Sequence, residues 1–427
     1  MSFRLLLSSS KLYSEVTIRQ SVRWLSVFGL FLVMISVSAA QAAERSTAGT
    51  ARRFVHPSDN PVAKRASDDF YNQDYDRAIR GFEGLAREHP DDPFVTNYLL
   101  SAVLFKELYR IGALETESYA NDSFMNRKAS RPLDPAVRAR ILELDRRGEA
   151  QAGRLLAQNP DDVDALYARG AAHALLCLYM GMGEKAWLSG LRAAIAARRD
   201  HERALELDPD YVDSKLVVGV HNYVVGSLSW PVRVSASIIG IGGNKQKGLN
   251  MLRQVANAGS LASPDAKLAL AMFLRREQAY DEALQVVRGL NVTYPRSCLI
   301  ALEYAHLLAA AGRGPESIAA YRQILNNYKE KKYPLPEPAT AAFFLGNALR
   351  GQHRFQEAAE AYDSVGTYPG ASHELIERAM LAAGEMYDTL QRRDLAVTRY
   401  QSLLVAGNNT GPAEIARRHL QQPYQYR

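Results

Sequence analysis

The stretch of this chain that comes nearest to a ligand-binding motif is Gly240-Ile241-Gly242-Gly243-Asn244-Lys245. Glycine-rich turns hold phosphate groups when they follow a strand and either end in Gly-Lys-Ser/Thr or place a third glycine before a helix. This stretch has neither ending, because Lys245 stands where the third glycine belongs, and the residues before it favour a helix. We therefore expect a glycine-rich turn in front of a helix, and no cofactor.

The side chains that most often carry catalysis are present without a catalytic arrangement. The nine histidines include no pair at metal-ligand spacing beside a carboxylate, and no Gly-x-Ser-x-Gly turn occurs. His201-Glu202 stands among arginines, which predicts a solvated helix face. Cys177 and Cys298 are expected to be two separate buried thiols, since they fall on distant repeat units. The sequence thus predicts no catalytic residue, no metal site and a protein that is not an enzyme.

The elements that would position any site repeat along the chain. Residues 345–362 read as a helix, a tight turn and a second helix. Gly346 and Ala358 have little or no side chain, so two antiparallel helices can approach closely, and Tyr362 is expected to fill the space between successive hairpins. The corresponding small residues of the later units are Gly248, Ala283, Ser317, Ala358 and Ala396. They recur at intervals close to the period of about 34 that is typical of stacked helical hairpins, which predicts a helical repeat array.

Over residues 64–410 this pattern resembles the tetratricopeptide repeat family. The resemblance implies an all-α fold, a right-handed superhelical solenoid of about eight helix-turn-helix repeats. Stacking is required because no single hairpin can bury its apolar face alone. We expect the solenoid over 63–411, followed by a capping helix and tail over 412–427.

Residues 1–42 have the composition of a secretory signal peptide. Two arginines precede the apolar run 24–37, and Ala40-Gln41-Ala42 fits the small-x-small pattern at which such signals are cleaved. The sequence then predicts a flexible segment over 43–62 and an exported protein, periplasmic or extracellular. An uncleaved signal that anchors the chain in the inner membrane is the alternative, and the run is short for a span of about 20 residues.

Charge gives no support to a nucleic-acid partner. The chain has 52 basic and 46 acidic residues. The predicted signal accounts for part of the excess, because it contains Arg4, Lys11, Arg19 and Arg23 against Glu15. Nucleic-acid binding needs a clustered basic face, which the nearly balanced remainder does not predict. We expect another protein or a peptide as partner.

Two hairpins are longer than the repeat requires, around 174–197 and around 224–247. Each gains about 15 residues at its tip, and consecutive inserts would lie side by side on one edge of the array. The tips are expected either to pack on each other or to form a second binding surface, with the 232–241 loop as a membrane contact in a third interpretation. The residues of this edge surface are Trp187, Trp230, Ile238, Ile239 and Ile241.

The concave groove is the leading binding surface, because the resemblance implies that the first helix of each repeat lines it. The groove residues expected to meet a partner are Leu268, Met272, Arg275, Leu302, His306, Phe343, Asn347, Arg350, Arg378 and Leu381. Asn347 stands where clamp-type members of the family hold a peptide carboxylate. Phe343 replaces the lysine expected one turn earlier, so an extended or helical peptide suits this groove better.

These observations favour a non-catalytic scaffold in the bacterial cell envelope that binds a protein or peptide through its groove. Across the two long hairpins the chain is also similar to a group of exported bacterial tetratricopeptide proteins. One alternative is an accessory structural subunit that attaches through the hairpin edge. The other is an enzyme acting on a glycan or small molecule, with a site in the inserts.

Overall fold

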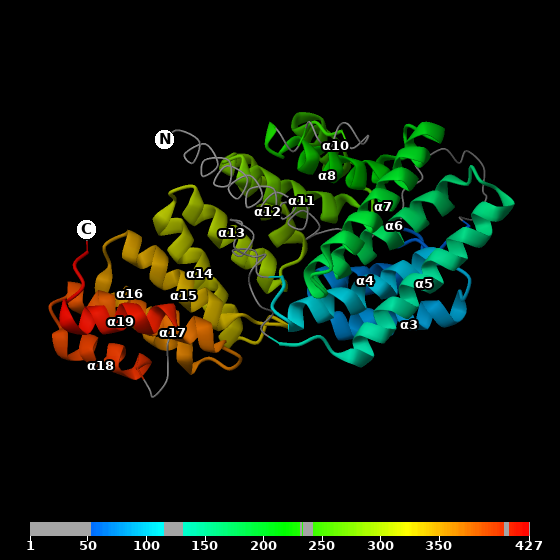
Figure 1. Ribbon diagram of the computed structural model, residues 1–427. Helices are drawn as coiled ribbons and strands as arrows, with labels where there is room; N and C mark the ends of the chain where they lie inside the picture. The colour runs from blue at the N-terminus through cyan, green and yellow to red at the C-terminus, as the bar shows by residue number, and fades with distance from the viewer. Residues whose placement is uncertain (1–52, 115–130, 231–232, 234–241, 405–409, 427) are drawn as a thin grey trace, which may run out of the picture. The chain divides into compact units, whose positions relative to one another are not determined.

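The computed structural model describes residues 53–114, 131–230, 233, 242–404 and 410–426, and these residues form seventeen α-helices without a strand (Figure 1). The predicted all-α fold of stacked helical repeats is therefore confirmed. The chain divides into two compact units, Met1–Glu277 and Gln278–Arg427. The signal peptide predicted over 1–42 lies outside the described residues, as do Ile238, Ile239 and Ile241.

The first unit is a series of helices in which each packs on the next. They are α2 (Pro61–Tyr71), α3 (Tyr75–Glu88), α4 (Pro93–Arg110), α5 (Pro135–Gln158), α6 (Val163–Leu178), α7 (Trp187–Leu207), α8 (Lys215–Gly226), α10 (Lys245–Asn257) and α11 (Ser263–Arg276). Residues 53–60, part of the segment predicted to be flexible, lie against α4. The Val55 N–H donates to Asp92 at 2.7 Å, and the Phe54 and Phe94 rings stack 5.0 Å apart.

The second unit continues in the same way, each helix packing on its successor. Its helices are α12 (Tyr280–Thr293), α13 (Cys298–Ala310), α14 (Gly314–Lys329), α15 (Pro338–Gly351), α16 (Phe355–Ser364), α17 (His373–Thr389), α18 (Arg393–Leu403) and α19 (Gly411–Gln421). The last of these covers α17 and α18 at the place where the sequence predicts a capping helix. Such a cap shields the apolar face of the last hairpin from water.

Helix starts and tight turns are encoded locally. Asp92 and Asp162 cap α4 and α6, each accepting from backbone N–H groups of the first turn. Left-handed backbone recurs in the turns at Gln73, Gln278, Gly312, His353 and Gln391, each five residues before the small residue that opens the second helix. In four of these turns the next N–H bonds back to the fifth carbonyl before it, as from Arg354 to Leu349 at 3.0 Å, which ends the first helix cleanly.

Small residues admit an aromatic ring within each hairpin. A β-carbon built on Gly346 would lie 2.5 Å from the Tyr362 ring, and one on Gly384 would lie 2.4 Å from the Tyr400 ring. Tyr362 therefore packs on the first helix of its own hairpin, whereas the sequence suggested the space between successive hairpins. The Tyr362 ring occupies space that a side chain would otherwise fill, and Gly346 provides that space.

The long hairpin at 174–197 is built from longer helices. After α6 the chain continues through a wide helical turn over Tyr179–Gly183, and α7 then begins at Trp187 and runs 21 residues. In this hairpin His201 takes the place of the aromatic, since a β-carbon on Gly170 would lie 2.8 Å from its ring. The solvated face predicted for His201 is wrong, because the ring is buried against Tyr167 at 5.0 Å between centroids.

Two further findings bear on function. Cys177 and Cys298 are free and buried, which confirms the expectation of two separate thiols. In the described ranges, no helix has both the length and the apolar character needed to cross a bilayer.

Candidate functional site

Five of the groove residues predicted in the second unit come together on one surface of two neighbouring first helices, α15 and α17, whereas Leu302 and His306 lie on α13. We call this surface the α15–α17 face; its residues are Phe343, Asn347, Arg350, Arg378, Leu381 and Glu385. Two contacts cross between the helices. The Arg378 guanidinium lies 4.7 Å from the centre of the Phe343 ring, and Arg350 Nη1 lies 3.4 Å from Glu385 Oε2. The two arginines thus define the two ends of one shared surface.

Phe343 supports this face from beneath. Its side chain is buried, and its ring also packs against Phe344 and Tyr362 at 5.4 and 5.7 Å between centroids. Arg378 itself is exposed, so a partner that reaches this point meets the guanidinium before the ring. The cation over the aromatic ring is weakly hydrated on one side, which favours contact with a planar or anionic group.

Asn347 is held by a tyrosine of its own hairpin. The Tyr362 hydroxyl donates to the Asn347 amide oxygen at 2.7 Å, which directs the amide nitrogen away from that hydroxyl. His306, one repeat earlier, shares a hydrogen bond of 2.7 Å with the Tyr321 hydroxyl in the same manner. In these two hairpins a polar residue of the first helix thus pairs with the tyrosine of the second helix. His306 and Leu302 are both buried in the core, so neither presents its side chain on the surface.

Glu385 is an acid held in a largely desolvated place. Burial raises the pKa of Glu385, Arg350 lowers it and Asp388 raises it. His419 Nε2 lies 3.6 Å from the other carboxylate oxygen. A carboxylate with a raised pKa beside an arginine is typical of binding and catalytic sites, although structural ion pairs produce the same pattern.

The remaining predicted groove residues belong to the first unit. Leu268, Met272 and Arg275 all lie on α11 and are half-buried. The contacts Arg378–Phe343 and Arg350–Glu385 join α15 to α17. Within the predicted groove, the α15–α17 face is accordingly the part for which cross-helix contacts are described.

The predicted edge surface is described in part. Trp187 begins α7 and lies 5.7 Å beneath the Lys185 ammonium, whereas Trp230 has 69% of its surface exposed. Leu188, beside Trp187, is 68% exposed. The three isoleucines of this surface lie outside the described residues.

Sequence reasoning missed a charged cluster between α5, α6 and α7. Arg169 binds both oxygens of Asp200, at 2.8 and 2.6 Å, and His173 Nδ1 lies 3.3 Å from the same carboxylate. Burial is the main cause that raises the pKa of Asp145 to about 6, and Glu149 adds to it. The signal was the one-turn spacing of Arg169 and His173, which puts both side chains on one face of α6.

The cluster has the residue types of acid–base chemistry without a demonstrated cavity. Over the described ranges, no group of three or more His, Cys, Asp or Glu side chains is arranged to hold a metal ion. Arg169 and Asp200 satisfy each other, which is the behaviour of a structural ion pair.

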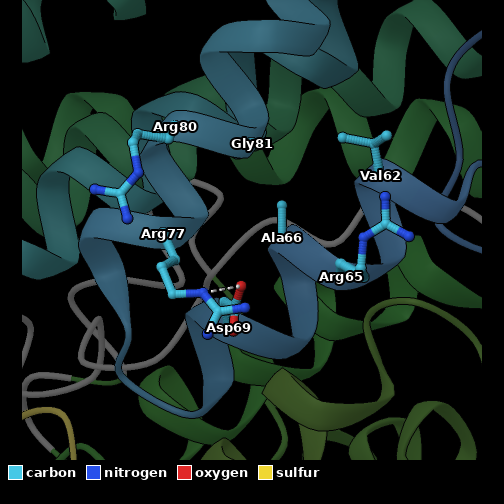
Figure 2. A pocket seen from close by; sticks show the side chains of 7 residues that line it. All are labelled: Val62, Arg65, Ala66, Asp69, Arg77, Arg80 and Gly81. Carbon is cyan, nitrogen blue, oxygen red and sulfur yellow. Dashed lines mark ion pairs between the residues drawn. The ribbon is translucent and has the colours of Figure 1, made fainter.

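A surface hollow of about 240 Å³ lies between α2 and α3, and Figure 2 shows Arg77 turned toward Asp69 beside it, 3.3 Å away. Its lining residues are Val62, Arg65, Ala66, Asp69, Arg77, Arg80 and Gly81. A β-carbon on Gly81 would lie 2.8 Å from that of Ala66, so the helices touch at its floor. The hollow is shallow and basic, and Asp69 neutralises part of that charge.

Comparison with known proteins identifies the repeats. Residues 302–372 match the tetratricopeptide repeat family model, and this stretch contains Gly346, Ala358 and Tyr362. No curated protein sequence matches the chain.

Solved structures with a similar fold are distant in sequence. A tetratricopeptide repeat protein from Parabacteroides merdae is 14% identical, with a TM-score of 0.31, over 76% of this chain and 97% of its own. Human IFIT1, solved as a dimer with m7Gppp-AAAA, is 12% identical with a TM-score of 0.38, over 86% and 88% of the two chains. Yeast Tom70 is 12% identical with a TM-score of 0.33, over 97% of this chain and 76% of its own.

The matched stretch and the other repeats of this chain are built in the same way. The close contact between a glycine and a ring in the second unit recurs at Gly170 in the first, and the left-handed turn recurs in both. Residues 302–372 are therefore identified as tetratricopeptide repeats, and the same helical construction extends beyond the matched stretch.

Proposed function

We propose that this protein is a non-catalytic scaffold that binds a peptide segment of a partner protein on the α15–α17 face. The observation that carries the proposal is the pair of cross-helix contacts, Arg378 over Phe343 and Arg350 with Glu385, which hold two arginines on one surface. Helical repeats of this type commonly serve as interaction scaffolds, and their first helices supply the binding residues.

The chemistry of the face favours an extended peptide. Arg378 offers a planar cation, Leu381 an apolar patch and Asn347 an amide that is already oriented by Tyr362. Arg350 adds a second cation, of which 39% of the side chain is exposed. A mixed row of this kind reads alternate side chains of a peptide and its backbone carbonyls, and does not suit a purely apolar helix.

We place the protein in the bacterial envelope, after export. This part of the proposal rests on the apolar run and the Ala40-Gln41-Ala42 pattern of the sequence. The N-terminal sequence of the chain recovered from fractionated cells checks it, since a chain that keeps residue 1 in the cytoplasmic fraction would refute export.

Crosslinking from the face tests the binding proposal. A photocrosslinker placed at Leu381 in the full chain should capture a discrete partner from envelope extracts. Arg378→Ala and Arg350→Ala should each reduce capture by about tenfold, as expected for the loss of a charged hydrogen bond. Phe343→Ala is unsuitable because the buried ring supports the fold.

The matched control is Arg322→Ala, which removes an exposed arginine of α14 that pairs with Glu357 of α16, both second helices of their hairpins. Capture unaffected by either face variant would refute the proposal. Loss of capture with Trp230→Glu alone would instead move binding to the hairpin edge and favour the accessory-subunit alternative.

A further inference from the structure

The segment after α19 is an extended peptide that lies on the second unit. Residues 422–426 have no helical structure, and Tyr424 and Tyr426 are half-buried while Gln425 between them is exposed. Alternate side chains of an extended chain point to opposite sides. The segment therefore places two aromatic side chains on the protein and turns the residue between them to solvent.

Both tyrosines have defined partners. The Tyr424 ring lies 5.5 Å from that of His419. The Tyr426 ring lies 4.9 Å from Phe355 and 5.5 Å from His353, at the turn between α15 and α16. Aromatic pairs at these distances contribute about 0.5–1.5 kcal/mol each beyond the area they bury. The segment thus runs back from α19 to the α15–α16 hairpin, which precedes the last hairpin of the chain.

A buried acid holds the segment by its backbone. The Tyr424 N–H donates to Asp388 Oδ2 at 2.9 Å. Asp388 also pairs with Arg393, at 2.9 Å, and accepts from the Tyr400 hydroxyl at 3.0 Å. Arg393 in turn donates to the carbonyls of His419 and Leu420, both at 2.8 Å. The backbone is therefore recognised at a fixed place, independently of the side chains.

The segment shares the charges of the α15–α17 face. Burial raises the pKa of Tyr424, the Glu385 carboxylate raises it and the Arg350 guanidinium lowers it. The same two charges act on the hydroxyl of Tyr362, which is bonded to Asn347. The contacts agree with this placement, because Tyr424 packs on His419, whose Nε2 lies 3.6 Å from Glu385 Oε1 at one end of the face.

We propose that this site takes extended peptides carrying two aromatic side chains at alternate positions, and that residues 422–426 are its resident occupant, which a partner must displace. The inference rests on the proposed function and names its ligand class. Asp388 receives the peptide N–H, the Phe355–His353 turn receives one ring, and the end of the face near Arg350 and Glu385 receives the other.

Residues 422–426 compete strongly with a free peptide because they are tethered to the site. A segment joined to its site by a short linker acts at an effective concentration on the order of millimolar. The apparent Kd of a free peptide rises in inverse proportion to the fraction of open sites, so 90% occupancy by the segment weakens it about tenfold. Removing the two tyrosines should lower the apparent Kd of the free peptide by that same factor.

The probe is a labelled, capped peptide with the sequence of residues 421–427, and fluorescence anisotropy measures its binding. It should bind the full chain with Tyr424→Ser and Tyr426→Ser about tenfold more tightly than the unaltered chain. The peptide with the same two changes should not bind, whereas the peptide with Gln425→Ala should bind equally well. Phe355→Leu in the Tyr424→Ser, Tyr426→Ser chain should weaken binding.

Two results overturn the inference: no saturable binding to a variant chain that keeps its melting temperature, or equal binding to both chains. A chain ending at Gln422 repeats the measurement if the double variant is less stable. A dimer that the tyrosine changes dissociate would show that a second copy supplies the segment. If the peptide fails while Arg378→Ala still reduces partner capture about tenfold, the proposed function stands without this ligand class.

Discussion

At the scale of single residues, the first unit contains an acid in an unfavourable place. Asp145 on α5 is buried, and desolvation is the first cause of its pKa of about 6, with Glu149 adding to it and His173 and Arg146 opposing it. In the unfolded chain this acid titrates near its ordinary value of 3.8. Between these two pKa values the folded chain therefore holds a proton that the unfolded chain has lost.

The sign of the linkage follows from that proton. The free energy of unfolding falls as pH rises from about 4 to about 6, and the penalty is fully present above pH 6. Asp145→Asn removes the charge and keeps the shape, so it should stabilise the first unit by about 1–3 kcal/mol at pH 7.5 and make no difference near pH 4. Urea unfolding followed by the fluorescence of Trp187 on α7 measures the free energy of unfolding at each pH.

Asp91→Asn is the control, because Asp91 is an exposed acid whose side chain pairs with Arg154 at the surface. It should give no gain at either pH. An equal effect of Asp145→Asn at pH 4 and pH 7.5 would contradict the assigned titration.

Single residues also show where sequence reasoning stops. The location of Arg350 and Arg378 on the first helices of two successive hairpins was predictable from the repeat pattern, and that they face a partner stays a prediction. The burial of His201 was not predictable, since the sequence separation between His201 and its partner Gly170 is nearly double that between Tyr362 and Gly346 in the regular repeat. The lengthened helices moved the pair beyond the spacing that identifies it.

At the scale of the element, the hairpin depends on the contact between glycine and ring. Gly346→Ala introduces a β-carbon 2.5 Å from Tyr362, so the ring or the helices must move. We expect a loss of about 1–3 kcal/mol from this overpacking, after any gain in helix propensity. Chemical denaturation of the full chain, followed by far-ultraviolet circular dichroism, measures the loss.

Gly289→Ala gives the matched control in the same unit. Gly289 lies inside α12, is exposed, and a β-carbon there would meet nothing within 4 Å. Alanine should stabilise that helix by up to about 1 kcal/mol. Two glycine-to-alanine changes in one unit should thus have opposite signs, and a loss at both positions would argue against the contact as the cause.

The hairpin was the most predictable element, and the turn was the least. The small residue, the aromatic residue and the lengths of the two helices could all be predicted from the sequence around Gly346. In four of the five turns the left-handed residue was not predictable, because Gln73, Gln278, His353 and Gln391 occupy it in place of the glycine found at Gly312. The tertiary contacts of the two helices compensate for a backbone conformation that costs about 1 kcal/mol.

At the scale of the whole molecule, the boundary between the two units falls at a place where the repeat pattern of the sequence is uninterrupted. The boundary between Glu277 and Gln278 falls in the turn between α11 and α12, inside the fifth predicted repeat. A pattern of small residues and aromatics predicts how each hairpin forms. It does not predict how strongly successive hairpins associate. The solenoid was therefore predictable as a family trait, and its division was not.

The two buried thiols report on the two units separately. Cys177 lies in the first unit and Cys298 in the second, and both are fully buried. A brief alkylation pulse at increasing urea, read by mass spectrometry, should label them with different midpoints, because a repeat array can open in parts. Gly346→Ala should shift the midpoint of Cys298 alone. Coincident midpoints that move together would show one cooperative structure.

The contact between Gly346 and Tyr362 also has a spectroscopic consequence. The α-proton of Gly346 that points where a β-carbon would stand faces the Tyr362 ring, and the corresponding proton of Gly384 faces Tyr400. Ring currents should displace these glycine resonances from the usual range, each by its own amount. Selective glycine labelling would then give one magnetic signal for each of two consecutive hairpins. Movement of α15 or α17 when a ligand binds could be followed at each hairpin, without a dye or an added label on the surface.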